Sequence, residues 1–238
     1  MRNKTMFIRQ ADIIRIGKLN TTTFTIIGCG GIGSPVAISL AKMGGEYINI
    51  YDNDSIEKHN IPNQFHKVKD IDENKAESLS KLVEELSDVK PNHYPDKYIN
   101  QKLSEITIAA VDSMKARKDI YLAFKSQKQA RVLIDTRMAG QFFDVFVVLK
   151  DNKSMKKYEK TIIRDENALQ ELCTNKAIIY NTFGIASFVC NIIKRLINNE
   201  LIYFKYSMDY RNMLLQTFKI ENYHYEQKEE ELYVYSND

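Results

Sequence analysis

The sequence predicts an α/β fold with a doubly wound, mainly parallel sheet and a C-terminal antiparallel hairpin. Short β-branched and apolar runs alternate with helical patterns as far as Ile134, which is typical of parallel strands joined by right-handed crossovers. The segments Phe204–Tyr210 and Met213–Ile220 flank Arg211-Asn212 and predict the hairpin. One sheet should therefore extend across most of the chain.

Composition indicates a soluble globular protein and disfavours several other classes. The 238 residues are 44% hydrophobic and 27% charged, and a net charge of +3 does not argue for nucleic-acid binding. No apolar run approaches the ~20 residues of a membrane span, and no signal-peptide core is visible. Cys29, Cys173 and Cys190 are too widely spaced for a disulfide framework or a zinc module. We expect a cytoplasmic protein without membrane contact.

We expect a single domain over residues 1–238, in four parts. The N-terminal arm (1–22) contains a short amphipathic helix, Met6–Leu19, that covers one face of the sheet. Residues 23–149 form the core of the fold, and residues 150–220 contribute a long helix and the hairpin. Residues 221–238 form an acidic tail.

The expected elements follow the core in order. The strands are Phe24–Ile27, Tyr47–Tyr51, Asn92–Tyr98, Ile106–Val111, Arg131–Ile134 and Phe142–Leu149. The helices are a segment with Ser34 as its N-cap and Gly44-Gly45 after its end, Glu73–Leu86 capped by Asp72, Lys115–Lys128, and Ala177–Leu196. The charged, weakly periodic stretch Lys150–Leu172 predicts a loop with short helices.

A glycine-rich turn follows the first strand. Its glycines are Gly28, Gly30, Gly31 and Gly33. They allow the backbone to approach phosphates, which the positive N-terminal end of the next helix also faces. Asp52 ends the following strand, where a carboxylate suits a ribose hydroxyl, and Asp112 and Asp135 should lie along the same edge. This Rossmann-like arrangement predicts a bound nucleotide, either ATP or NAD.

The residues around the turn narrow this choice. They are Gly28-Cys29-Gly30-Gly31-Ile32-Gly33-Ser34, then Asp52-Asn53-Asp54-Ser55-Ile56-Glu57, Asn60, Gln64, Lys75, and Asp112 five residues before Arg117. In this order they resemble the ThiF/MoeB/HesA family of adenylating enzymes, which includes ubiquitin-activating proteins. The resemblance spans roughly Arg9 to Asp135 and continues more loosely to Leu196. The chain looks like a minimal, stand-alone form of the adenylating core.

The resemblance implies an enzyme that binds ATP and Mg²⁺ and joins the C-terminal carboxylate of a protein or peptide to AMP, releasing pyrophosphate. The implied nucleotide-binding residues are Gly28, Gly30, Gly31, Gly33, Asp52, Asp54, Asn60, Gln64, Lys75 and Arg117. Asp112 matches the magnesium ligand, and Arg9, Lys75 and Asp112 are the implied catalytic groups. Arg9, with Arg15 as a rival, matches an arginine that reaches the nucleotide of the other subunit in a homodimer.

The chemistry itself agrees with these roles. A carboxylate nucleophile is already ionised at pH 7, so the reaction needs positioning and cations rather than a general base.

Three features depart from the family pattern. Asn63 stands where the family has arginine before Gln64, and Arg137 is a candidate replacement. There is no Cys-x-x-Cys pair for a structural zinc, and the length leaves no room for a separate cysteine or ubiquitin-fold domain.

A further acyl transfer to Cys173 is a hypothesis. Cys173-Thr174 resembles the Cys-Thr at the acyl-accepting cysteine of ubiquitin-like-activating enzymes, and the helix that follows would favour a thiolate. A buried structural cysteine is the alternative, and we interpret Cys29 and Cys190 in that way. The histidines show no metal-ligand spacing and receive no functional role: His59, His66, His93 and His224.

We therefore expect an adenylyltransferase for a small ubiquitin-like, sulfur-carrier or peptide substrate with a glycine-like C-terminus. Three alternatives stay open. The same chemistry could act on a carboxylate borne by transfer RNA, although the modest net charge disfavours it. An NAD-dependent oxidoreductase lacks support from a recognisable substrate domain. A non-catalytic ATP-binding partner is motivated by Asn63.

Overall fold

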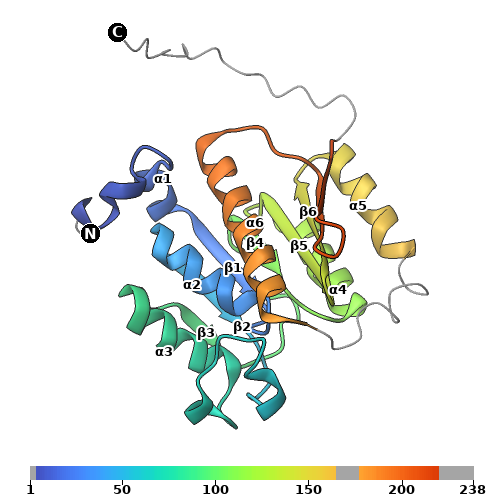
Figure 1. The fold of residues 1–238 in the computed structure, drawn as a ribbon. Helices are drawn as coiled ribbons and strands as arrows, with labels where there is room; N and C mark the ends of the chain where they lie inside the picture. Colours follow the sequence, from blue (N-terminus) through green and yellow to red (C-terminus); the bar gives the residue numbers. More distant parts are fainter. Residues whose placement is uncertain (1–3, 165–176, 220–238) are drawn as a thin grey trace.

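The computed structural model describes residues 4–164 and 177–219. Its eight strands form one sheet in the order β3-β2-β1-β4-β5-β6-β7-β8 (Figure 1). The strands are β1 (Thr23–Ile27), β2 (Tyr47–Tyr51), β3 (Asn92–Tyr94), β4 (Ile106–Ala109), β5 (Val132–Ala139), β6 (Phe142–Leu149), β7 (Lys205–Asp209) and β8 (Leu214–Phe218). The α-helices are α1 (Ile16–Thr21), α2 (Gly33–Met43), α3 (Lys75–Ser87), α4 (Met114–Ser126), α5 (Asn152–Arg164) and α6 (Ile179–Asn198).

The sheet changes character halfway along. Strands β3, β2, β1, β4 and β5 pair in parallel, with Ile26 of β1 opposite Ile50 of β2 and Ile108 of β4. Strands β5 to β8 then pair antiparallel; β5–β6 and β7–β8 are hairpins, whereas α5 and α6 lie between β6 and β7 in the chain. The predicted fold class, a mainly parallel doubly wound sheet with a C-terminal antiparallel hairpin, is confirmed.

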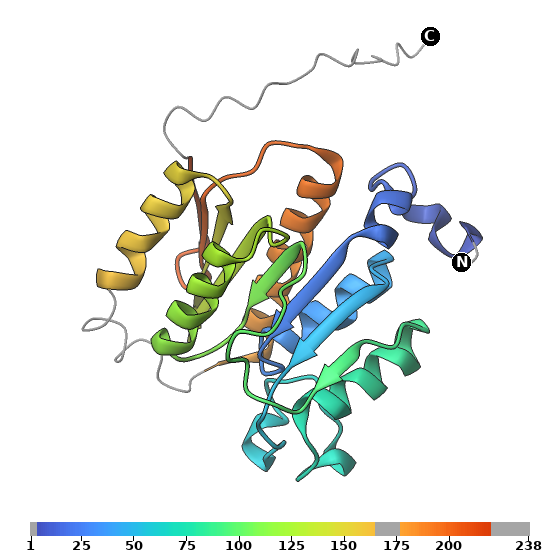
Figure 2. The ribbon, with the colours of Figure 1, turned by 180° about the vertical axis from the view of Figure 1, so that it is seen from behind.

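Helices cover both faces of the sheet. Helices α2, α3 and α6 pack on one face and form the larger apolar core with alternate residues of the strands (Figure 1). Helices α4 and α5 cover the other face of the C-terminal half, seen from behind in Figure 2. Successive side chains of a strand point to opposite faces of the sheet. Because helices cover both faces, the central strands are buried on both sides. The described helices include none that is long and apolar enough to span a membrane.

Two predicted helix caps were wrong. Helix α2 begins at Gly33 with Ile32 at the N-cap, so Ser34 lies inside the first turn and bonds to the glycine turn instead. Asp72 adopts a left-handed backbone (φ 74°), which is incompatible with the extended N-cap conformation. Asn74 caps α3, and its side chain accepts hydrogen bonds from the backbone N–H groups of Ala76 and Glu77.

The ends of several other elements also differ from the prediction. The arm is broken into a 3₁₀ helix η1 (Lys4–Gln10) and α1, because a turn after Gln10 intervenes. The stretch after Lys150, predicted as a loop with short helices, contains the 13-residue helix α5, whose inward residues include Ser154, Tyr158 and Ile162. Strand β3 is shorter than predicted, and β5 continues to Ala139.

Candidate active site

The glycine turn between β1 and α2 is closely packed against its surroundings. Gly28 has φ 97°, and a Cβ there would lie 2.4 Å from the carbonyl oxygen of Ala110. A Cβ on Gly33 would lie 1.8 Å from the carbonyl oxygen of Gly28. A Cβ on Gly30 would meet only the amide of Gln64, at 3.6 Å from its Nε2. The first two glycines are required by the fold of the turn, whereas Gly30 faces a more open side.

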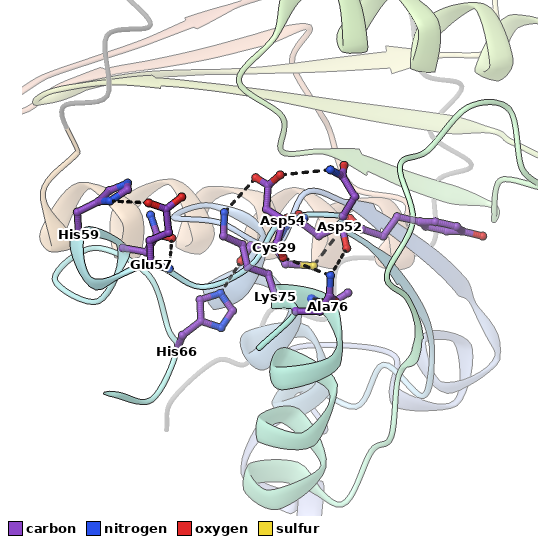
Figure 3. A network of polar contacts seen from close by, with 12 residues as sticks. Cys29, Asp52, Asp54, Glu57, His59, His66, Lys75 and Ala76 are labelled. Carbon is purple, nitrogen blue, oxygen red and sulfur yellow. Dashed lines mark hydrogen bonds and ion pairs between the residues drawn. The ribbon is translucent and has the colours of Figure 1, made fainter. Parts of the chain in front are cut away.

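Asp52, just after β2, fixes the turn from the neighbouring strand. Its Oδ2 accepts a hydrogen bond of 2.6 Å from the backbone N–H of Cys29, and its Oδ1 accepts one of 2.9 Å from Asp54 (Figure 3). Burial raises the pKa of Asp52, and these donors together with the nearby Lys75 oppose that rise. The carboxylate thus lies at the carboxyl edge of the sheet beside the first residues of the glycine turn.

The start of α3 brings a lysine to the same edge. Lys75 is the first residue of the helix, and its Nζ lies 3.1 Å from Oδ2 of Asp54, with the side chain only 10% exposed (Figure 3). Asn74 holds this arrangement, because its Nδ2 donates to the carbonyl oxygens of Asp52 (3.0 Å) and Asp54 (3.2 Å). The unfavourable position of a cation in a first helical turn is offset by its acidic partner.

A loop from residue 57 to 66 closes over the turn. Asn60 is buried, and its Oδ1 accepts a hydrogen bond of 3.0 Å from the N–H of Glu57. The Oγ of Ser34 donates to the carbonyl oxygen of Gly30 (2.7 Å) and accepts from the N–H of Phe65 (3.0 Å). His66 is buried with its Nε2 at 2.9 Å from the carbonyl oxygen of Cys29, and burial lowers its pKa. The loop and the turn are therefore held together at several points.

Asp112 and Arg117 lie on the other side of the turn, after β4. Asp112 is exposed in the segment between β4 and α4, next to Val111. Arg117 is buried, and its guanidinium donates to the carbonyl oxygens of Val111 and Thr136. Arg117 thus supports the backbone beside Asp112 rather than reaching into solvent.

Asp135 lies level with the ends of the parallel strands, as predicted, but its side chain is buried rather than open to a ligand. Asp135 is inside β5, opposite Ala109, and is 0% exposed because β5 continues beyond it. Its carboxylate pairs with Arg117 and with Nε of Arg137, the latter at 2.8 Å. The guanidinium of Arg137 also lies 4.4 Å from the ring centre of Phe146. Because of these contacts, Arg137 does not lie at the glycine turn. It therefore does not replace the positive charge that is missing at Asn63.

Other predicted residues lie elsewhere or outside the described ranges. Arg9 is exposed on η1, and Arg15 precedes α1, where its N–H donates to Oδ1 of Asn198 at 3.1 Å. Neither is among the residues that surround the glycine turn as described above. Cys29 and Cys190 are buried, in agreement with structural roles, whereas Cys173 lies outside the described residues.

Comparison with known proteins identifies the family. The model of the ThiF family matches residues 3–231, nearly the whole chain. The chain belongs to the ThiF family. Among curated relatives, the adenylyltransferase and sulfurtransferase MOCS3 of Dictyostelium discoideum is 34% identical over 90 residues, 37% of this chain and 21% of that protein. MOCS3-2 of Zea mays is 29% identical over 108 residues, 42% of this chain and 22% of that protein.

Solved structures agree on the fold of this ThiF-family chain. The E. coli MccB structure with AMPCPP and MccA superposes with a TM-score of 0.72 at 14% identity, covering 92% of this chain and 72% of MccB. The E. coli MccB structure with ATP also gives 0.72, at 15% identity and with the same coverage. The chain spans only about a fifth of the length of the curated relatives named above.

The residues of the ThiF-family site suit a nucleotide. The side-chain oxygens of Asn63 and Gln64 are buried without a hydrogen-bond partner among the described residues, and the amide of Gln64 lies beside Gly30, so these two acceptors could receive hydrogen bonds from a hydroxyl or amino group of a ligand. The described residues contain no group of three or more His, Cys, Asp or Glu that could hold a metal ion unaided. Asp112 is exposed beside the turn and can supply one carboxylate. This fits Mg²⁺, which proteins commonly bind through one or two carboxylates together with phosphates and water.

Sequence reasoning missed the residues that hold the site together. Asn74 carries a recognisable signal, since asparagine before a helix favours the N-cap position. The roles of Ser34 and His66 carry no comparable signal, because both depend on contacts across a turn that only the folded chain defines.

Proposed function

We propose that the chain is an ATP-dependent adenylating enzyme that joins the C-terminal carboxylate of a small protein or peptide to AMP. The observation that carries this proposal is the convergence of the glycine turn, Asp52 and Lys75 at the carboxyl edge of the sheet in a ThiF-family chain. The MOCS3 relatives are named as adenylyltransferases and sulfurtransferases, and MccB has been solved with ATP and with MccA. A ubiquitin-like, sulfur-carrier or peptide substrate follows by analogy.

The residues supply position and charge. The glycine turn and the N-terminal end of α2 accommodate phosphates, and Asp52 accepts hydrogen bonds from ribose hydroxyls. Lys75 can exchange its ion pair with Asp54 for a phosphate oxygen, so Asp54 keeps the ammonium group in place before the nucleotide binds. Asp112 would hold Mg²⁺, which offsets the negative charge that moves onto pyrophosphate. Asn60 and Gln64 complete the proposed nucleotide-binding set, whereas Arg117 is buried against Asp135 and acts by supporting the backbone beside Asp112.

The substrate carboxylate is the nucleophile and needs no base. Two anions must come together, so each cation at the site lowers the barrier directly. In the proposed homodimer, Arg9 of one subunit contributes to the site of its partner, with Arg15 as the alternative. A later transfer of the acyl group to Cys173 remains part of the proposal and is tested by the loss of a thioester in a Cys173→Ser variant.

Pyrophosphate exchange tests the main proposal. Labelled pyrophosphate should enter ATP only when a protein or peptide with a free C-terminal carboxylate is present. Asp112→Ala should lower the exchange rate by ~10²–10³. Asp119→Ala is the matched control, because Asp119 is an exposed acid on α4 away from the turn. Full exchange in Asp112→Ala would contradict the site assignment.

Other readings give different results. ATP binding without exchange for any carboxylate substrate would favour the non-catalytic partner, which the neutral side chain of Asn63 motivates. Thermal stabilisation by NAD but not by Mg-ATP would favour the oxidoreductase. Exchange that depends on a transfer RNA bearing a free carboxylate would move the substrate from protein to nucleic acid.

A further inference from the structure

The outward face of α5 carries a stripe of lysines. They are Lys153, Lys156, Lys157 and Lys160. Their spacing of i, i+3, i+4 and i+7 places them within about 100° around the helix axis. The opposite side packs into the core through Ser154, Tyr158 and Ile162, which are buried. Lysines are thus the main side chains that α5 presents outward.

One acid on α5 offsets only part of this charge, because Glu159 interacts with Lys156 of the stripe but is shared with helix α4. The single acid of the helix is Glu159, whose Oε1 accepts from Lys125 of α4 at 2.8 Å and from the hydroxyl of Tyr121 at 2.9 Å. Lysines three and four residues apart on one helix face repel each other. The helix therefore gains stability when an anionic group lies along its outer face.

Helix α4 extends the positive surface. It lies beside α5 on the same side of the sheet (Figure 2) and contributes the exposed residues Lys115, Lys118 and Lys125. Asp119 is the acidic residue of α4. The two helices together form what we term the basic face.

Charge along the chain is strongly divided. Residues 221–238 contain six acids and one lysine, a formal charge of −5, so residues 1–220 carry +8 in a chain whose net charge is +3. Four of the acids fall close together: Glu226, Glu229, Glu230 and Glu231. Their spacing of three and four residues resembles that of the lysine stripe.

The acidic segment starts next to the stripe. Strand β8 ends at Phe218, and the carbonyl oxygen of Lys219 accepts a hydrogen bond of 2.8 Å from Nζ of Lys157. Glu226 follows seven residues later, a span of up to ~24 Å of extended chain. Lys153 and Lys160 lie only about 5–6 Å along the helix axis from Lys157. The segment 226–231 can therefore reach every lysine of the stripe.

We propose that the segment 226–231 binds the basic face of the same chain and shields it from other polyanions. Charge complementarity and the tether at Lys157 carry this inference, which is independent of the adenylation chemistry. The lysines of the basic face then bind other polyanions only when the segment is displaced, for example by high salt or by a stronger polyanion.

Zero-length carbodiimide cross-linking of the full-length protein tests the contact. Linkages should form between the stripe and Glu226, Glu229, Glu230 or Glu231 within one chain, and they should disappear at about 1 M salt, where the Debye length is ~3 Å. The variant with Lys153, Lys156 and Lys160 changed to glutamine should lose them. A control variant changes three exposed lysines elsewhere, Lys69, Lys97 and Lys102, and should keep them.

Heparin binding tests the shielding. With all four glutamates of segment 226–231 changed to glutamine, full-length protein should bind heparin about tenfold more tightly, because an intramolecular competitor at millimolar effective concentration has been removed. Adding the three α5 substitutions should abolish that gain. Equal heparin affinity with and without the four glutamates, or cross-links found only between two chains, would overturn the proposal.

Discussion

Replacing Asp135 by asparagine should destabilise the protein severely, because it leaves two guanidinium groups buried without their shared counter-ion. Burial alone raises the pKa of Asp135, yet Arg117 and Arg137 outweigh burial and hold that pKa below its usual value. The carboxylate is 0% exposed, and Arg117 and Arg137 are 3% and 9% exposed. Breaking a buried pair from one side typically costs ~3–5 kcal/mol.

This cost can be converted into a melting temperature. An unfolding entropy of ~2.1 cal/mol/K per residue gives ~0.5 kcal/mol/K for 238 residues, so each kcal/mol lowers Tm by about 2 °C. Asp135→Asn should therefore lower Tm by about 6–10 °C at pH 7 in a calorimetric or dichroism melt. Adding Arg137→Met should recover part of this loss, since it removes one of the two uncompensated charges.

The control and the pH dependence sharpen the test. Asp144 lies opposite Arg137 on β6 and pairs with Lys205 at 2.8 Å, but it is 15% exposed, so Asp144→Asn should cost at most ~1 kcal/mol. Because the folded pKa of Asp135 is lowered, its stabilisation is complete above the unfolded pKa of ~3.9 and is lost as the pH falls through the folded value. The gap between wild type and Asp135→Asn should narrow only below about pH 4. Equal Tm shifts for the two variants at pH 7 would refute the reasoning.

Further predictions concern the glycine turn and its supports. Gly33→Ala should abolish ATP binding by calorimetry, because its Cβ would lie 1.8 Å from a carbonyl oxygen, whereas Gly17→Ala meets nothing within 4 Å and should be neutral. Asn74→Ala should lose ~1 kcal/mol of stability and also raise the KM for ATP, whereas the α4 cap variant Ser113→Ala should lose similar stability with an unchanged KM. Burial lowers the pKa of His66, so the folded state resists its protonation and stability should fall as the pH drops below ~6.5; denaturant melts of His66→Gln should show a weaker fall between pH 7 and 5.

The parts of the site that are contiguous in sequence could be predicted. Gly28 to Gly33 and Asp52 belong to consecutive elements of the chain. The local sequence pattern of a strand, a glycine turn and a helix therefore predicts their positions. The fold class followed for the same reason, since the strand and helix periods are short-range properties of the chain.

The supports of the site could not be predicted, because they join distant segments. Asp135 pairs with Arg117, which is 18 residues away, and its strand continues past the point where the apolar run ends. Only the packed structure shows that the Asp135 carboxylate is enclosed at this edge by Arg117 and Arg137 and closed to solvent. Helix α5 is longer than the short helices predicted for Lys150–Leu172, although its buried Tyr158 and Ile162 and its outward lysines do follow a helical period.

The buried cluster around Asp135 has a consequence for the nucleotide. Arg117 bonds both to the carboxylate of Asp135 and to the carbonyl oxygen of Val111, so the cluster is anchored directly behind the segment that carries Asp112. An ion pair fixed in the interior is screened by salt much less than one on the surface. The backbone beside Asp112 is thus held by a support that is insensitive to ionic strength and that acts without touching the nucleotide.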